Sequence, residues 1–132
     1  MPAPPQIVFG AASLGHEFLT EESVQEVLTL LKTLQISQID TAARYPPINH
    51  GMSENLLGIT HAASQGFAIA TKVFTTGGDG SGELDRASIQ RSFTASLERL
   101  GVDKVIENED SGGLSGADLS RSIFYTFTVQ IL

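Results

Sequence analysis

The sequence predicts an α/β fold in which parallel strands alternate with helices. Short apolar stretches recur about 30 residues apart, at residues 7–10, 36–41 and 67–72, with a weaker one at residues 104–106. The segments that separate these stretches carry apolar residues at helical spacing. Because strands joined by helices are typical of βα units, we expect a parallel sheet.

The first helix is marked at its start by Thr20, whose hydroxyl can accept a hydrogen bond from the first turn. Glu21 and Glu22 follow, and carboxylates at this end of a helix interact favourably with its dipole. Apolar residues at helical spacing then form one stripe that should face the core. These residues are Val24, Val27, Leu28, Leu31 and Leu34.

The second helix is expected to start at Ser53 and to stop by Gly66. Leu56 and Leu57 would point inward from it. Gly58 lies in the middle of this segment and lowers its helix propensity.

The third helix is the best delimited at both ends. Asp85 can cap its start, and Gly101 stands where a left-handed residue commonly ends a helix. The residues expected on its buried face are Ile89, Phe93, Leu97 and Leu100.

The sequence changes character between a body of residues 1–105 and a tail of residues 106–132. Residues 107–110 are Glu, Asn, Glu and Asp, whereas a buried parallel strand would be apolar there. Residues 111–122 are rich in Gly and Ser, as linkers are, and residues 123–132 turn β-branched and aromatic.

Charge and composition exclude several classes of function. The formal net charge is −7, from 8 basic and 15 acidic residues, so nucleic acid would be repelled on average. The absence of cysteine excludes disulfides and thiolate metal sites, and we expect no metal. The N-terminus has no signal-peptide pattern, and the longest apolar run is about half as long as a membrane-spanning helix. We expect a cytoplasmic protein without a nucleic-acid or membrane partner.

Three polar side chains follow the ends of predicted strands. Asp40 and Lys72 each lie at the carboxyl end of a strand, and Tyr45 lies in the loop after the first of these two. Because α/β folds place active sites at this end of the sheet, we expect the three groups to converge. Taken singly, each has an ordinary structural interpretation: Asp40 as a cap, Lys72 as a partly solvated strand end, and Tyr45 as loop packing.

Together with their neighbours, these residues resemble the opening signature of the aldo-keto reductases. The matching segments are Ile-Asp-Thr-Ala at 39–42, Tyr45, Gly-Met-Ser-Glu at 51–54, Leu-Gly at 57–58 and Ala-Thr-Lys at 70–72. The resemblance runs from about Ile7 to Val105. Val-Phe-Gly at 8–10 and the loop of residues 46–51 look most like the aflatoxin-aldehyde-reductase-like branch.

The resemblance implies a (β/α)8 TIM barrel, of which this chain would form the first three to four units. It implies an oxidoreductase that reduces a small-molecule aldehyde or ketone with NADPH. Tyr45 would be the general acid that protonates the carbonyl oxygen, Lys72 would favour release of that proton, and Asp40 would hold Lys72. The residues expected to contact the cofactor are Gly10, Ala11, Ala12 and Asp40.

The fourth residue of the family's active-site set, a histidine, is missing from its expected place, where this sequence has Ser111. His16, His50 and His61 remain as stand-ins, with ordinary surface positions as the alternative for all three. Of these, His50 lies in the loop that follows the second strand. The Gly-rich residues 75–83 match neither a phosphate-binding loop nor a calcium loop, so we expect a flexible loop there.

A complete barrel of this kind takes about 250 residues, so we expect a truncated barrel without the half that holds the cofactor phosphates. Reductase activity should then be weak or absent. The alternative is a non-catalytic product that self-associates, or pairs with a partner, through sheet edges left open at strands one and four. Residues 123–132 would either cover one edge or add exposed apolar surface. A third possibility is a self-contained small α/β binding domain.

Overall fold

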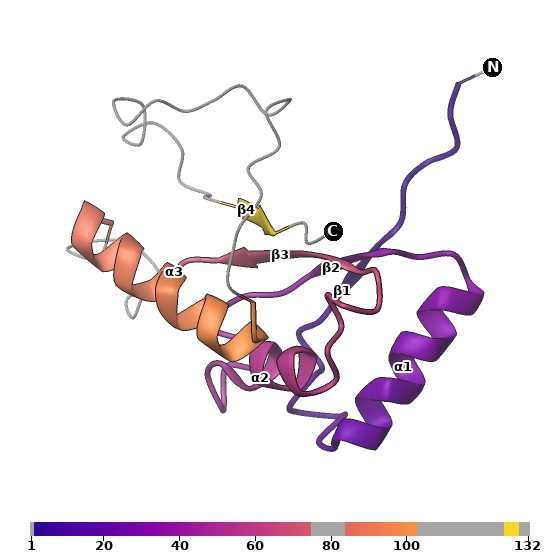
Figure 1. Ribbon diagram of the computed structural model, residues 1–132, viewed down its shortest axis with the longest axis horizontal. Helices are drawn as coiled ribbons and strands as arrows, with labels where there is room; N and C mark the ends of the chain where they lie inside the picture. Colours follow the sequence, from indigo (N-terminus) through magenta and orange to yellow (C-terminus); the bar gives the residue numbers. More distant parts are fainter. Residues whose placement is uncertain (1, 75–83, 103–125, 130–132) are drawn as a thin grey trace.

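The computed structural model describes residues 2–74, 84–102 and 126–129 of the 132-residue chain. Figure 1 shows the helices along one face of the sheet, which is the predicted α/β class. The elements are β1 (Val8–Gly10), α1 (Glu21–Thr33), β2 (Gln38–Asp40), α2 (Met52–Ile59), β3 (Ala68–Lys72), α3 (Arg86–Leu100) and β4 (Thr126–Val129).

The strands form one open sheet in the order β1-β2-β3-β4. The first three are parallel, with Gly10 opposite Asp40 and Asp40 opposite Ala70. The predicted strands at residues 7–10, 36–41 and 67–72 and their parallel direction are therefore confirmed. The three strands and their helices have the arrangement of successive βα units that have not closed into a barrel.

The fourth strand of the described sheet comes from the tail of the chain. β4 runs antiparallel to β3, with Ile69 opposite Val129 and Lys72 opposite Thr126. It comes from the apolar end of the tail, so this segment covers the edge of β3. The weak strand predicted at residues 104–106, the loop of residues 75–83 and residue 111 lie outside the described residues.

The start of α1 is fixed by two reciprocal hydrogen bonds. Ser23 N donates to Thr20 Oγ1 at 3.2 Å, and Thr20 N donates to Ser23 Oγ at 3.2 Å. This capping box satisfies two main-chain donors at the helix end, and it confirms Thr20 as the capping residue. Of the predicted stripe, Val24, Leu28 and Leu31 are buried and Val27 packs against the core while partly exposed.

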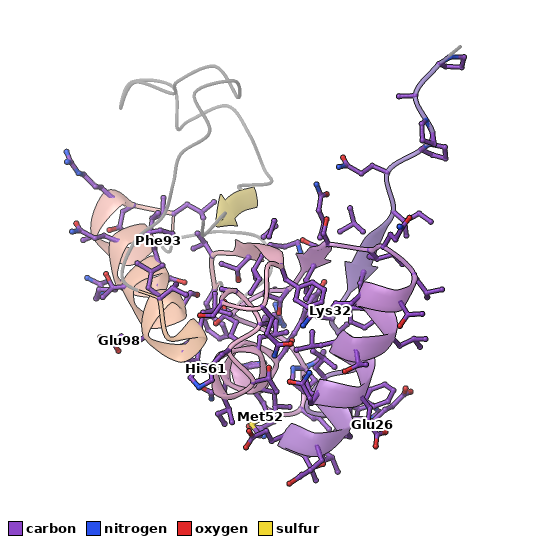
Figure 2. The ribbon with its side chains drawn as sticks, turned by 45° about the vertical axis from the view of Figure 1, so that its right-hand side comes forward. Glu26, Lys32, Met52, His61, Phe93 and Glu98 are labelled. Carbon is purple, nitrogen blue, oxygen red and sulfur yellow. The ribbon has the colours of Figure 1, made fainter. Side chains whose placement is uncertain are left out.

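The prediction for Leu34 is wrong. This side chain is 57% exposed, because α1 ends at Thr33 and the chain turns away through Gln35, which has a positive φ of 58°. Helical spacing therefore no longer applies at position 34. Figure 2 shows the polar side of the amphipathic helices, with Glu26 and Glu98 pointing outward from α1 and α3.

α2 starts one residue earlier than predicted and ends at Ile59, well before Gly66. Leu56 and Leu57 are buried as expected. The glycine in the middle of the helix has a packing role, because a Cβ at Gly58 would lie 2.1 Å from the main-chain oxygen of Arg99 on α3. Glycine at this position lets the two helices approach closely.

α3 has both predicted ends. Asp85 accepts a hydrogen bond from Ser88 N at 3.0 Å, and Gly101 has the left-handed conformation of a helix end, with φ 68°. Its predicted buried face is only partly confirmed. Leu100 is 3% exposed and belongs to the core, whereas Ile89, Phe93 and Leu97 are half-buried.

The Asp85 cap predicts a pH dependence of stability. The Ser88 hydroxyl, which donates to Asp85 at 2.6 Å, and the Ser88 N–H lower the pKa of Asp85 from its ordinary value of 3.8. Because the folded-state pKa lies below the unfolded value, the cap stabilises the fold fully above the unfolded pKa. That contribution is lost as pH falls through the folded pKa.

Asp85→Asn caps without titrating, so the stability difference between wild type and this variant should shrink on acidification. Denaturant unfolding at a series of pH values measures it, and a constant difference would contradict it.

Candidate active site

Asp40 and Lys72 come together at the carboxyl ends of β2 and β3. The register sets Asp40 opposite Ala70, so Lys72, two residues further along β3, lies on the same face of the sheet. Lys72 Nζ donates to Asp40 Oδ2 at 2.7 Å and to the Thr41 carbonyl at 2.9 Å. Both side chains of the ion pair are about one-third exposed, so the pair is open to solvent and accessible to a ligand.

Tyr45 is held beside this ion pair by the loop after β2. Lys72 Nζ lies 5.3 Å from the centroid of the Tyr45 ring, a cation–π contact. The main chain of Tyr45 is fixed at both ends, since its N–H donates to the Ala42 carbonyl at 3.0 Å and its carbonyl accepts from Ser53 N at 3.1 Å. The structure therefore brings together the three residues that were singled out from strand-end positions.

Three of the four residues expected to contact the cofactor, Gly10, Ala11 and Ala12, lie at the carboxyl end of β1, next to β2 and the fourth residue, Asp40. Ala11 N donates to the Asp40 carbonyl at 2.8 Å, and Ala11 is fully buried, while Gly10 and Ala12 are exposed. A Cβ built at Gly10 would meet no atom within 4 Å. Among the described residues, the surface at Gly10 and Ala12 is thus open.

The start of α2 supports these strand ends in a way that was not predicted from the sequence. Ser53, expected only as the first helical residue, is buried and donates its hydroxyl hydrogen to the Ala11 carbonyl at 2.9 Å. Its Oγ also lies 2.9 Å from Thr41 Oγ1. A small polar residue at the start of a predicted helix is a common capping pattern, so no signal in the sequence distinguished this role from a cap.

The neighbouring Glu54 joins three elements. It has no solvent exposure, accepts from Arg99 Nε of α3 at 2.7 Å and from the Thr71 hydroxyl of β3. Arg99 also donates to Ser96 of its own helix. The sequence contained a signal for this pairing, because Glu54 lies close to the apolar Leu56 and Leu57. A carboxylate that is buried with such residues is normally paired.

The candidate histidines lie apart from these contacts. His50 packs edge-on against Phe74, with ring centroids 5.0 Å apart, and lines a hollow of about 460 Å³ together with residues of α3. His16 is exposed in the turn after β1. His61 is exposed beyond α2, on the side away from the sheet (Figure 2). The hydrogen bonds, ion pair and cation–π contact described above for Asp40, Tyr45 and Lys72 involve none of these histidines.

Within residues 2–74, 84–102 and 126–129, no helix has both the length and the apolar character to cross a bilayer. The same part of the chain brings together no group of three or more side chains suited to a metal ion.

The chain is similar to known proteins in sequence and in fold. A family model described as the Aldo/keto reductase family matches residues 6–105. The fold is similar to that of the holo form of the aldo-keto reductase AKR11C1 from Bacillus halodurans, with a TM-score of 0.56 and 24% sequence identity. The matched region covers 81% of this chain and 38% of the solved one, so this chain spans well under half of that reductase.

Proposed function

The chain belongs to the aldo/keto reductase family, and from this premise we propose that it carries the Asp–Tyr–Lys part of a site that reduces aldehydes or ketones with NADPH. The observation that carries this proposal is the placement of the Lys72 ammonium, which is held by Asp40 and lies over the Tyr45 ring. We also assign the chain to the aflatoxin-aldehyde-reductase-like branch, on the sequences of residues 8–10 and 46–51.

In this proposal Tyr45 donates its phenolic proton to the oxygen of a small-molecule carbonyl substrate. The Lys72 ammonium favours the negative charge that the phenol then acquires. Asp40 and the Thr41 carbonyl keep Lys72 in place, since two of its three donors are committed to them. The open surface of Gly10 and Ala12 would receive the nicotinamide ring beside Asp40. NADPH, when bound there, supplies the hydride.

Turnover by residues 1–132 alone is proposed to be slow or absent. The position of the family's histidine holds Ser111, and beyond Arg99 the basic residues are Lys104 and Arg121. A dinucleotide phosphate held by so few cations would bind weakly. The Asp–Tyr–Lys set can therefore be present without a firmly held cofactor.

Replacing Tyr45 tests the proposal directly. Incubation of the purified protein with NADPH and an aromatic aldehyde should give a slow loss of NADPH absorbance. Tyr45→Phe should lower that rate by roughly a hundredfold or more, because general acid catalysis is worth about 10²–10⁴-fold. The chain has two tyrosines, so Tyr125→Phe is the matched control and should retain the rate. Equal rates in the two variants would contradict the role of Tyr45.

A second candidate function is self-association through the β1 edge, with no catalysis. β1 ends the sheet that the described residues form, and Ile7 and Val8 beside this edge are 63% and 48% exposed. An unpaired strand edge with apolar neighbours favours pairing with another chain. Light scattering after size exclusion distinguishes the candidates: a monomer at every concentration would reject self-association, whereas no turnover and no NADPH binding would reject catalysis.

A further inference from the structure

Ser53 is the point at which three parts of the proposed site meet. Its main-chain N–H donates to the carbonyl of Tyr45 at 3.1 Å. Its hydroxyl donates to the carbonyl of Ala11 at 2.9 Å, in the segment proposed to face the nicotinamide. The same hydroxyl oxygen is 2.9 Å from Thr41 Oγ1. Ser53 and Thr41 are both fully buried, so water does not compete for these bonds.

The direction of the hydroxyl pair follows from donor counting. A serine hydroxyl has one hydrogen, and that of Ser53 goes to the Ala11 carbonyl, which can only accept. Thr41 is therefore the donor to Ser53. This bond fixes the residue whose carbonyl accepts from Lys72 Nζ at 2.9 Å. The N–H of Ser53 thus bonds to Tyr45. Its hydroxyl bonds to Ala11, beside the proposed nicotinamide surface, and to Thr41, whose carbonyl accepts from the Lys72 ammonium.

We propose that Ser53 is a positioning residue of this site, which sets the relative placement of Tyr45 and Lys72 while touching neither substrate nor cofactor. The interpretation of this site as a reductase site rests on the proposed function. The placement of Tyr45 and Lys72 by Ser53 does not depend on it. The family signature accounts for Ser53 as part of a sequence pattern only. Its hydrogen bonds to Ala11 and Thr41 give the residue a physical role.

The test compares Ser53→Ala with Thr60→Ala. Thr60 is a buried hydroxyl at the other end of α2, and its Oγ1 donates to the Leu56 and Leu57 carbonyls away from the site. Ring-labelled tyrosine in the full chain gives two sets of NMR signals, which Tyr125→Phe assigns, because the chain has two tyrosines. Ser53→Ala should shift the Tyr45 ring signals, and Thr60→Ala should leave them in place although both variants lose stability.

Equal shifts in the two variants, or no shift in either, would overturn the positioning role. If Ser53→Ala does not fold, Thr41→Val removes the same hydroxyl pair from the other side with almost no change of shape, and the same shift is expected. Where wild type turns over NADPH, Ser53→Ala should lower kcat by roughly ten- to a hundredfold with a smaller change in KM. Absence of both turnover and NADPH binding in wild type would count against the proposed function alone, because the ring signals decide the geometric claim.

Discussion

Glu54→Ala is expected to lower the free energy of unfolding by about 3 kcal/mol, as removal of one partner of a buried ion pair does. Glu54 is fully buried, and it accepts hydrogen bonds from Arg99 and from Thr71. Its loss leaves a partly buried guanidinium and a buried hydroxyl without their acceptor. Because the Arg99 side chain is 26% exposed, water compensates in part. Denaturant unfolding followed by circular dichroism gives the value.

Two further variants make this result specific. Glu54→Gln keeps an amide oxygen that can accept from Thr71 or Arg99, so a smaller loss is expected. Glu98→Ala removes an exposed carboxylate from α3 and should change stability by no more than about 0.5 kcal/mol. If Glu54→Ala cost no more than Glu98→Ala, the buried pair would have no stabilising role.

Gly58→Ala should destabilise the protein by about 3 kcal/mol, the upper part of the usual range for overpacking. Helix propensity alone would favour alanine by about 1 kcal/mol, so the sign of the effect separates two explanations. The added Cβ would lie 2.1 Å from the Arg99 main-chain oxygen and 3.0 Å from the Leu100 carbonyl carbon. Both neighbours are main-chain atoms of α3, which cannot move aside as a flexible side chain would.

Gly10→Ala is the matched control, because a Cβ at Gly10 meets nothing within 4 Å. We expect this variant to unfold at nearly the wild-type denaturant concentration. A Gly58→Ala protein more stable than wild type would show that α2 and α3 can separate at little cost.

Local patterns explain most of the fold that could be predicted from the sequence. The caps at Thr20, Asp85 and Gly101 depend on side chains and main-chain groups a few residues apart, which the order of residues displays directly. Leu34 was misplaced because the helix ended one residue before it, at a left-handed turn through Gln35. Helical spacing has meaning only inside a helix.

Contacts between distant segments account for what the sequence did not indicate. Asp40, Tyr45 and Lys72 could be grouped because the carboxyl ends of parallel strands necessarily meet at one edge of a sheet. The sequence alone indicates only that Gly58 lowers the helix propensity of α2. Its packing role depends on Arg99, which belongs to another helix. The antiparallel pairing of β4 with β3 was equally inaccessible, because β-branched and aromatic residues indicate a strand without indicating its direction or partner.

The position of β4 gives the outer sides of β1 and β3, which border the three parallel strands, different properties. The main-chain groups on the outer side of β3 are already bonded to Thr126–Val129, whereas those on the outer side of β1 have no strand beside them in the described sheet. A polypeptide that lengthens the sheet at β1 only adds hydrogen bonds. One that lengthens it at β3 must first replace those of β4, so growth there is strand exchange rather than addition.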